Sequence, residues 1–156
     1  MRRTNVSKLT LLAVLTALTL VLGKFVSIPT PTGFLTLLDA GVFFTAFYLG
    51  AKEGAIVGGL SGFLIDLISG YPQWMFFSLL AHGGQGYFAG WTGKSRPIGL
   101  ALSSLVMVGV YFLASIPLYG LGSAIAGLWG NIMQNFFGLL IGYVVYLAYS
   151  KVSPGK

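Results

Sequence analysis

Long apolar runs separated by short polar or charged breaks follow one another along the chain. No Asp, Glu, Lys or Arg occurs in residues 67–93 or in residues 97–150. A helix needs roughly 20 mainly apolar residues to cross a membrane, so the second run can cross twice, with a break at the Pro- and Gly-containing residues 117–122. The pattern predicts a compact all-α bundle that forms one transmembrane domain over residues 1–156. We expect its six membrane-spanning helices at residues 8–26, 38–50, 53–69, 72–91, 97–117 and 121–149.

The composition excludes most soluble classes of protein. Apolar residues make up 56% of the chain and charged residues only 8%, whereas soluble domains carry about 25% charged residues. A soluble enzyme, a nucleic-acid binder and a disordered chain are therefore excluded, and an integral membrane protein remains. The chain has no cysteine, which removes disulfides, thiolate metal sites and cysteine nucleophiles from consideration.

The cations are distributed unequally between the two sides of the predicted bundle. With six spans both termini lie on one side, and the opposite side carries only Lys24. Lys and Arg collect on the cytoplasmic side of membrane proteins, so we expect both termini in the cytoplasm. The first helix resembles a signal peptide but lacks a small-x-small cleavage site, and we expect it to be retained. The cations predicted inside are Arg2, Arg3, Lys8, Lys52, Lys94, Arg96, Lys151 and Lys156.

The outer loop at residues 24–37 is the longest segment predicted to be non-helical. It contains Ile28-Pro29-Thr30-Pro31-Thr32-Gly33, and a residue before proline favours extended backbone. The loop is either a shaped cover over the outer end or a simple connector.

Small residues recur at a spacing of four on several predicted helices, which lets helices approach closely in lipid. We expect the glycine ridges to pack inside the bundle. Ala13 and Ala17 on the first helix form a similar pair, which fits either an internal contact or a partner surface. The ridges are Gly54, Gly58 and Gly62, then Gly86 and Gly90, then Gly138 and Gly142.

Polar and aromatic side chains inside three of the spans predict a ligand pocket in the outer half of the bilayer. Polar groups are costly in a membrane, so their presence there is informative. Several share one face of their helix, and Gln85 would lie below the cavity. An aromatic pocket with amide groups suits a small, flat, uncharged polar ring; the alternative is hydrogen bonding between helices without a ligand. The residues are Trp74, Ser78, His82, Tyr111, Trp129, Asn131, Gln134 and Asn135.

The two carboxylates of the predicted outer half have simple structural interpretations. Asp39 begins the second helix, where it would cap the helix or, less simply, contact substrate. Asp66 would pair with Lys24 near the outer end of the third helix or, as for Asp39, contact substrate instead. His82 is the only histidine, and no second ligand lies one turn away, so we expect no metal site.

Two short motifs raise enzymatic alternatives. Gly59-Leu60-Ser61-Gly62 has the form found at the nucleophile of rhomboid proteases, and His82 is the only histidine that could act as its base. Gly93-Lys94-Ser95 resembles the end of a phosphate-binding loop, but Phe88 stands where the first glycine is required. We therefore expect no ATP site and no cofactor in this chain, so uphill transport would need a partner or an ion gradient.

The longest distinctive stretch runs from Gly58 to Trp74 and contains an Asp-Leu-x-x-Gly-Tyr-Pro-x-Trp motif at residues 66–74. An Ile-Pro-x-Pro loop leading to Leu-Asp-Ala-Gly precedes it, as does the Ala-x-x-x-Ala pair. With these motifs the sequence resembles the substrate-binding S components of energy-coupling factor (ECF) vitamin transporters, particularly the hydroxymethylpyrimidine and riboflavin group. The resemblance covers most of the chain.

This resemblance implies a function without catalysis in the chain itself. An S component of the bacterial cytoplasmic membrane captures a vitamin or its precursor from outside. Its Ala-x-x-x-Ala surface docks on a transmembrane coupling subunit attached to two cytoplasmic ATPases, and it topples to release substrate inside. The family site uses the first outer loop and the fourth to sixth helices. Hydroxymethylpyrimidine or a pyridoxine-like ring fits best, riboflavin needs a larger cavity, and an intramembrane protease, a passive channel or an assembly protein are the alternatives.

Overall fold

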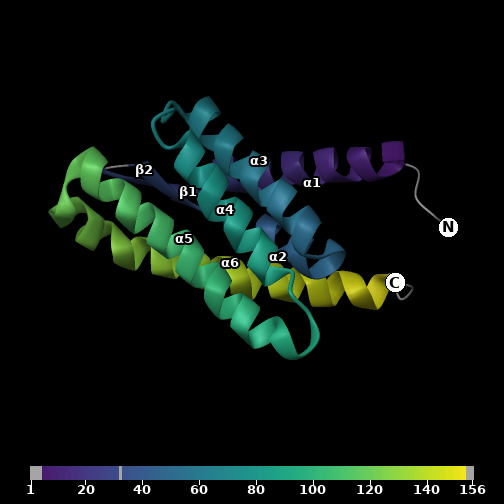
Figure 1. The fold of residues 1–156 in the computed structure, drawn as a ribbon. Coiled ribbons are helices and arrows are strands. Elements are labelled where there is room, and N and C mark those ends of the chain that lie inside the picture. The colour runs from purple at the N-terminus through teal and green to yellow at the C-terminus, as the bar shows by residue number, and fades with distance from the viewer. Residues whose placement is uncertain (1–4, 32, 154–156) are drawn as a thin grey trace.

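The computed structural model describes residues 5–31 and 33–153, with six α-helices where the sequence predicts six (Figure 1). Their ends differ from the predicted ends by a few residues. Arg2, Arg3 and Lys156, which we expect on the cytoplasmic side, lie outside the described residues. The elements are α1 (Asn5–Phe25), β1 (Ser27–Thr30), β2 (Gly33–Thr36), α2 (Leu38–Leu49), α3 (Ala51–Ser69), α4 (Met75–Ala89), the short 3-10 helix η1 (Gly93–Ser95), α5 (Arg96–Tyr119) and α6 (Leu121–Val152).

Three stretches in the described residues are long and apolar enough to cross a membrane: Val6–Phe25, Gly93–Tyr119 and Leu121–Val152. The 12 residues of α2 rise about 18 Å at 1.5 Å per residue, which is short of the roughly 30 Å hydrocarbon layer. At Gly50, φ is +105°, a conformation that favours glycine, and this residue joins α2 directly to α3.

The glycine ridge of α3 packs against α4, as the sequence predicts. A Cβ atom at Gly54 would lie 2.6 Å from the carbonyl oxygen of Gly86, and one at Gly62 would lie 2.5 Å from that of Ser78. A Cβ at Gly58 would overlap the backbone of His82. The absence of side chains thus lets two backbones touch over about two turns, which is how helices associate without a hydrophobic driving force in lipid.

The centre of the bundle is α2. Leu38, Val42 and Phe43 are completely buried. On α6, a Cβ at Gly138 would overlap Asp39, and one at Gly142 would lie 2.7 Å from the carbonyl oxygen of Ala40. The glycine pair on α6 therefore lets that helix lie directly against α2, as expected for an internal ridge.

The outer segment forms a β-hairpin, where the sequence leaves open an extended cover or a simple connector. Strands β1 and β2 pair antiparallel, with Ser27 opposite Thr36 and Thr30 opposite Gly33. Two short extended stretches on either side of a Pro-containing turn that ends at Gly33 are compatible with a hairpin. The adjacent apolar residues Phe34 and Leu35 break the alternation of apolar and polar positions, so the sequence signal is weak. The hairpin lies at the end of the bundle where α5 and α6 meet (Figure 1).

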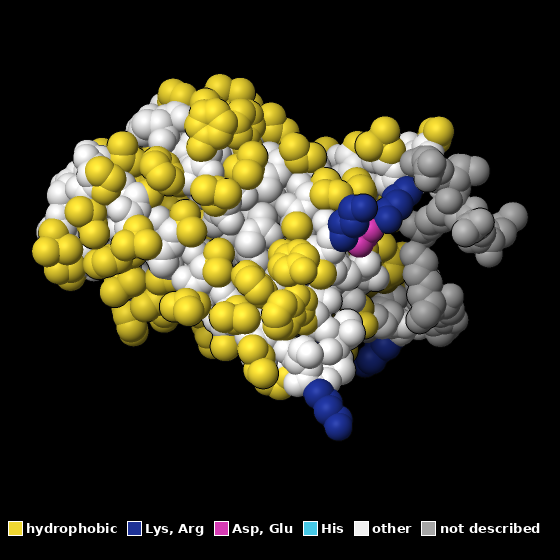
Figure 2. All heavy atoms as spheres, viewed as in Figure 1, with side chains coloured by type: hydrophobic (Ala, Val, Ile, Leu, Met, Phe, Trp, Pro, Cys, Tyr) yellow, Lys and Arg dark blue, Asp and Glu magenta, His cyan; other side chains and the backbone are white. Residues whose placement is uncertain are grey.

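The surface agrees with a membrane protein that has one charged end. Apolar side chains cover much of the face in Figure 2, and the Lys and Arg side chains visible there gather at the end where α1 begins and α6 ends. Lys8 pairs with Glu53 at this end. Ala13 and Ala17 are exposed on the outer side of α1, whose opposite side packs through Leu12 and Leu15, so this pair does not serve an internal contact in the described structure.

Candidate ligand-binding site

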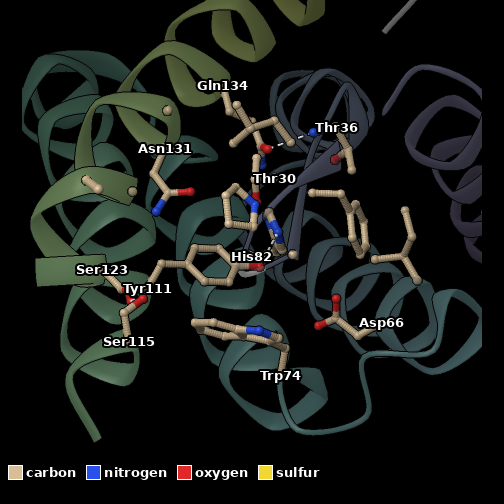
Figure 3. A pocket seen from close by; sticks show the side chains of 18 of the residues that line it. Thr30, Thr36, Asp66, Trp74, His82, Tyr111, Ser115, Ser123, Asn131 and Gln134 are labelled. Carbon is tan, nitrogen blue, oxygen red and sulfur yellow. Dashed lines mark hydrogen bonds between the residues drawn. The ribbon is translucent and has the colours of Figure 1, made fainter. Parts of the chain in front are cut away.

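A cavity of about 460 Å³ lies between the hairpin and helices α3 to α6 (Figure 3). Its volume falls within the range of small-molecule sites. The hairpin closes one side, while α4 and α5 supply aromatic side chains and α6 supplies amides and small residues. The polar and aromatic lining residues are Thr30, Phe34, Thr36, Asp66, Trp74, His82, Tyr111, Ser115, Ser123, Asn131 and Gln134.

Two of the aromatic side chains that line the cavity pack against each other. Trp74, just before α4, is buried, and its ring lies 5.7 Å from that of Tyr111 on α5. Tyr119 stacks on the far side, with its ring 5.8 Å from that of Trp74 and tilted by 26°. Such packing fixes the indole as a flat apolar wall and adds roughly 0.5–1.5 kcal/mol per aromatic pair beyond area burial.

His82 stands at the centre of a buried hydrogen-bond network. Its Nδ1 lies 3.0 Å from Oε1 of Gln85 and 3.1 Å from Oδ1 of Asp39. Both neighbours are acceptors, so Nδ1 carries a proton and donates it. The Tyr111 hydroxyl lies 3.0 Å from Nε2 and 2.7 Å from Oγ of Ser78, and in the neutral imidazole Tyr111 therefore donates to His82 and accepts from Ser78.

The network continues below the cavity to α6. Gln85 Nε2 donates to Oδ1 of Asn135 over 2.9 Å, and Asn135 Nδ2 donates to Oγ of Ser104 over 2.7 Å. Ser104 in turn donates to the carbonyl oxygen of Leu100. Every link runs in one direction, so these amides satisfy one another. A satisfied buried network fixes side-chain orientation, whereas an incomplete one is costly.

Gln134 connects the hairpin to the bundle. Its Oε1 accepts the backbone N–H of Thr36 over 2.7 Å, and its Nε2 lies 3.4 Å from Oδ1 of Asp39. Both ends of this amide are engaged within the protein. In contrast, no side-chain hydrogen bond joins Asn131, one turn earlier on α6, to another described residue. Its side chain points into the cavity in Figure 3.

The predicted site residues divide into three groups. Trp74, His82, Tyr111, Asn131 and Gln134 line the cavity. Ser78 and Asp39 lie behind these residues and bind Tyr111 and His82, whereas Asn135 binds Gln85 below the cavity. Trp129 is misplaced by the sequence analysis. Its side chain is 68% exposed on the outside of α6 and does not line the cavity.

The carboxylates differ most from the sequence prediction. Asp39 makes no cap hydrogen bond for α2 but is fully buried beside His82. Asp66 lines the cavity, and the expected pairing with Lys24 is wrong, because the Lys24 amine instead donates to Oγ of Ser69 over 3.1 Å. A signal for Asp66 existed, since it follows Gly62 at the spacing of four that turns the glycine ridge towards α4.

The positions of Ser61 and His82 do not support the protease alternative. Ser61 is buried, and its Oγ has no hydrogen-bond partner among the described residues. His82 instead contacts Gln85, Asp39 and Tyr111 through its two ring nitrogens. A serine nucleophile needs its base within hydrogen-bond reach. In residues 5–31 and 33–153 no group of three His, Cys, Asp or Glu side chains could hold a metal ion.

The fold is an apolar helical bundle, and aromatic and amide side chains line a cavity at one end of it. This fold and this site define a membrane-embedded small-molecule-binding protein. The family model described as "ECF-type riboflavin transporter, S component" matches residues 3–151. The chain belongs to this family of ECF transporter S components. It is therefore a substrate-binding subunit for vitamin uptake, and the family is not a catalytic one.

Individual relatives agree with this assignment. The chain is 50% identical over 144 residues to the "Thiamine precursor transporter HmpT" of Lactococcus lactis subsp. cremoris, covering 90% of this chain and 86% of the relative. It is 32% identical over 136 residues to an uncharacterized protein of Pyrococcus woesei, covering 83% and 91%. The solved structure of an S component of a bacterial ECF transporter superposes with a TM-score of 0.67 at 26% identity, covering 97% of this chain and 98% of that one.

Proposed function

We propose that this protein captures a thiamine precursor, hydroxymethylpyrimidine or a closely similar ring, at the outer face of the membrane. The observation that carries the proposal is the 460 Å³ cavity, where the Trp74 wall faces the free amide of Asn131. The 50% identity to a thiamine precursor transporter supports the same substrate class. The ring would stack on Trp74, while Asn131 would bind its polar edge.

The remaining predicted site residues would act mainly by holding other side chains and the hairpin in position. Asp39 contacts both His82 and Gln134. Gln134 also binds the hairpin, Ser78 and His82 bind Tyr111, and Asn135 binds Gln85. These residues would hold Tyr111 and the cover in place. A buried donor left unpaired costs about 1–3 kcal/mol. A ligand that cannot meet the groups facing the cavity would therefore bind weakly, and the hairpin would exclude water once closed.

Delivery would depend on partners. We infer a multi-pass subunit of the bacterial cytoplasmic membrane, with residues 1–156 forming one domain of six spans and both termini inside, in line with the cations at one end (Figure 2). The exposed Ala13 and Ala17 would dock on the ECF coupling subunit, which carries two cytoplasmic ATPases. ATP would be used by those subunits and no cofactor by this one. Toppling within the module would carry the enclosed substrate inward.

Ligand binding by purified protein tests the substrate. We would measure tryptophan fluorescence and thermal stability with hydroxymethylpyrimidine, thiamine, pyridoxine, riboflavin, pantothenate, folate and biotin. We expect saturable binding of hydroxymethylpyrimidine and a raised melting temperature, because a ligand that binds only the folded state stabilises it. Tighter binding of riboflavin or pyridoxine would refute the proposed substrate, and no response from folded protein would refute capture of these vitamins.

A passive channel is separated from a capture subunit by its energy requirement. In proteoliposomes, a channel would equilibrate the ring without partners. An S component should accumulate it only when the ECF coupling subunit and ATPases are present with ATP. Equilibration by this chain alone would contradict the proposal.

A further inference from the structure

Asp66 occupies a position that hydrogen bonding inside the protein does not explain. It lies near the C-terminal end of α3, is only 6% exposed, and lines the cavity beside Trp74 (Figure 3). The family resemblance places the site on the first outer loop and the fourth to sixth helices, so α3 lies outside that set. A carboxylate inside the apolar part of a membrane protein is costly and marks a functional group by default.

The protein leaves this carboxyl group incompletely satisfied. Ser78, His82 and Tyr111 lie near the Asp66 carboxyl group, yet its Oδ2 is buried without a hydrogen-bond partner among the described residues. The ion pairs within residues 5–31 and 33–153 are Lys8 with Glu53 and His82 with Asp39, so no lysine or arginine described there neutralises Asp66. A buried polar group without its partner costs free energy that a bound donor would recover.

Three other polar side chains of the cavity wall, unlike the Asn131 amide, are already engaged within the protein. Both ends of the Gln134 amide are engaged, and both nitrogens of His82 are engaged. The Tyr111 hydroxyl binds Ser78 and His82. A carboxylate accepts hydrogen bonds and donates none. The ligand edge that meets Asp66 must therefore carry an N–H or O–H group.

We propose that Asp66 is a specificity-determining contact, which selects a ring that carries an exocyclic amino group. This inference rests on the proposed function, because it names the chemical group by which the same pocket recognises its substrate. The amino N–H donates to the carboxylate while the ring lies on Trp74. A ring with a carbonyl oxygen in the amino position would bring two acceptors together.

The test compares two pyrimidines that differ at this one group, 4-amino-5-hydroxymethyl-2-methylpyrimidine and its 4-oxo counterpart. Dissociation constants are measured for the wild type, Asp66→Asn and Ser61→Ala. The last is a matched control, because Ser61 also lies on α3 with a buried, unpartnered oxygen but does not line the cavity. We expect the wild type and Ser61→Ala to prefer the amino ring by about 10- to 100-fold, the range of a hydrogen bond to a charged group.

Asp66→Asn should lose most of this preference, because its amide presents a donor as well as an acceptor. A preference in Asp66→Asn equal to that of the wild type would overturn the inference. If that variant does not fold, the wild type still decides, since equal binding of the two rings would refute a selecting carboxylate while leaving the pyrimidine substrate in place. Wild-type protein that binds neither ring would refute the proposed substrate and this inference together.

Discussion

Replacing Gln134 with alanine tests whether the hairpin is a cover held shut by α6. The side chain accepts the Thr36 N–H over 2.7 Å and reaches Asp39 over 3.4 Å. The hairpin supplies much of one cavity wall. Removing the amide therefore leaves the hairpin sequence unchanged but removes the direct hydrogen bond between the hairpin and α6.

The size of the effect follows from one partly buried hydrogen bond. Such a bond contributes about 0.5–1.5 kcal/mol net, and more when its loss leaves a donor unpaired. A loss of about 1.4 kcal/mol lowers the ratio of closed to open cover roughly tenfold. Since apparent affinity falls with the fraction of binding-competent protein, we expect the dissociation constant of Gln134→Ala to rise about 3- to 10-fold.

Stopped-flow tryptophan fluorescence measures this change directly, because Trp74 lies in the cavity wall. We expect most of the loss in a faster dissociation rate, since an open cover releases the ligand. Gln73→Ala is the matched control. Gln73 also donates a side-chain hydrogen bond, to the Tyr119 hydroxyl over 3.1 Å, but it is exposed and does not line the cavity. Wild-type binding and dissociation constants in Gln134→Ala would refute the role of the cover.

Three further predictions concern docking, packing and the misplaced tryptophan. Ala13→Trp with Ala17→Trp should abolish transport in a reconstituted ECF module while ligand affinity stays unchanged, because both alanines are exposed away from the cavity; loss of ligand binding as well would indicate misfolding. Gly58→Leu should lower the melting temperature in detergent strongly, since its Cβ would overlap the His82 backbone, and wild-type stability would contradict the close packing of α3 and α4. Trp129→Ala should leave the dissociation constant of the ligand unchanged, because Trp129 is 68% exposed on the outside of α6. Weaker ligand binding in equilibrium titrations would show that Trp129 belongs to the site.

The relation between sequence and structure is clearest on α6. Asn131, Gln134 and Asn135 share one side of a helix by spacing alone, and the structure turns that side inward. Trp129 is close in sequence, and its aromatic character suggested the pocket, yet it lies outside. Helical periodicity gives the angle between side chains on one helix, but it does not give the rotation of that helix about its own axis.

The same limit applies to the buried carboxylates. Asp39 begins α2, so a cap was the simplest local interpretation, but α6 approaches so closely at Gly138 that Asp39 lies inside the bundle. Its partners His82 and Gln134 are distant in sequence. Local propensity describes neighbours along the chain, whereas these hydrogen bonds depend on how three helices cross.

The six helices, the apolar character and the glycine ridges can be predicted from the sequence, because each depends on composition or spacing within one segment. Which polar groups face the cavity and which satisfy one another depends on how the helices pack. This packing joins Gln85 to Asn135 across 50 positions and leaves Asp66 at the cavity wall. The physical reason is that helix crossing angles and axial rotations follow from the packing of all the helices together, and no single segment contains that information.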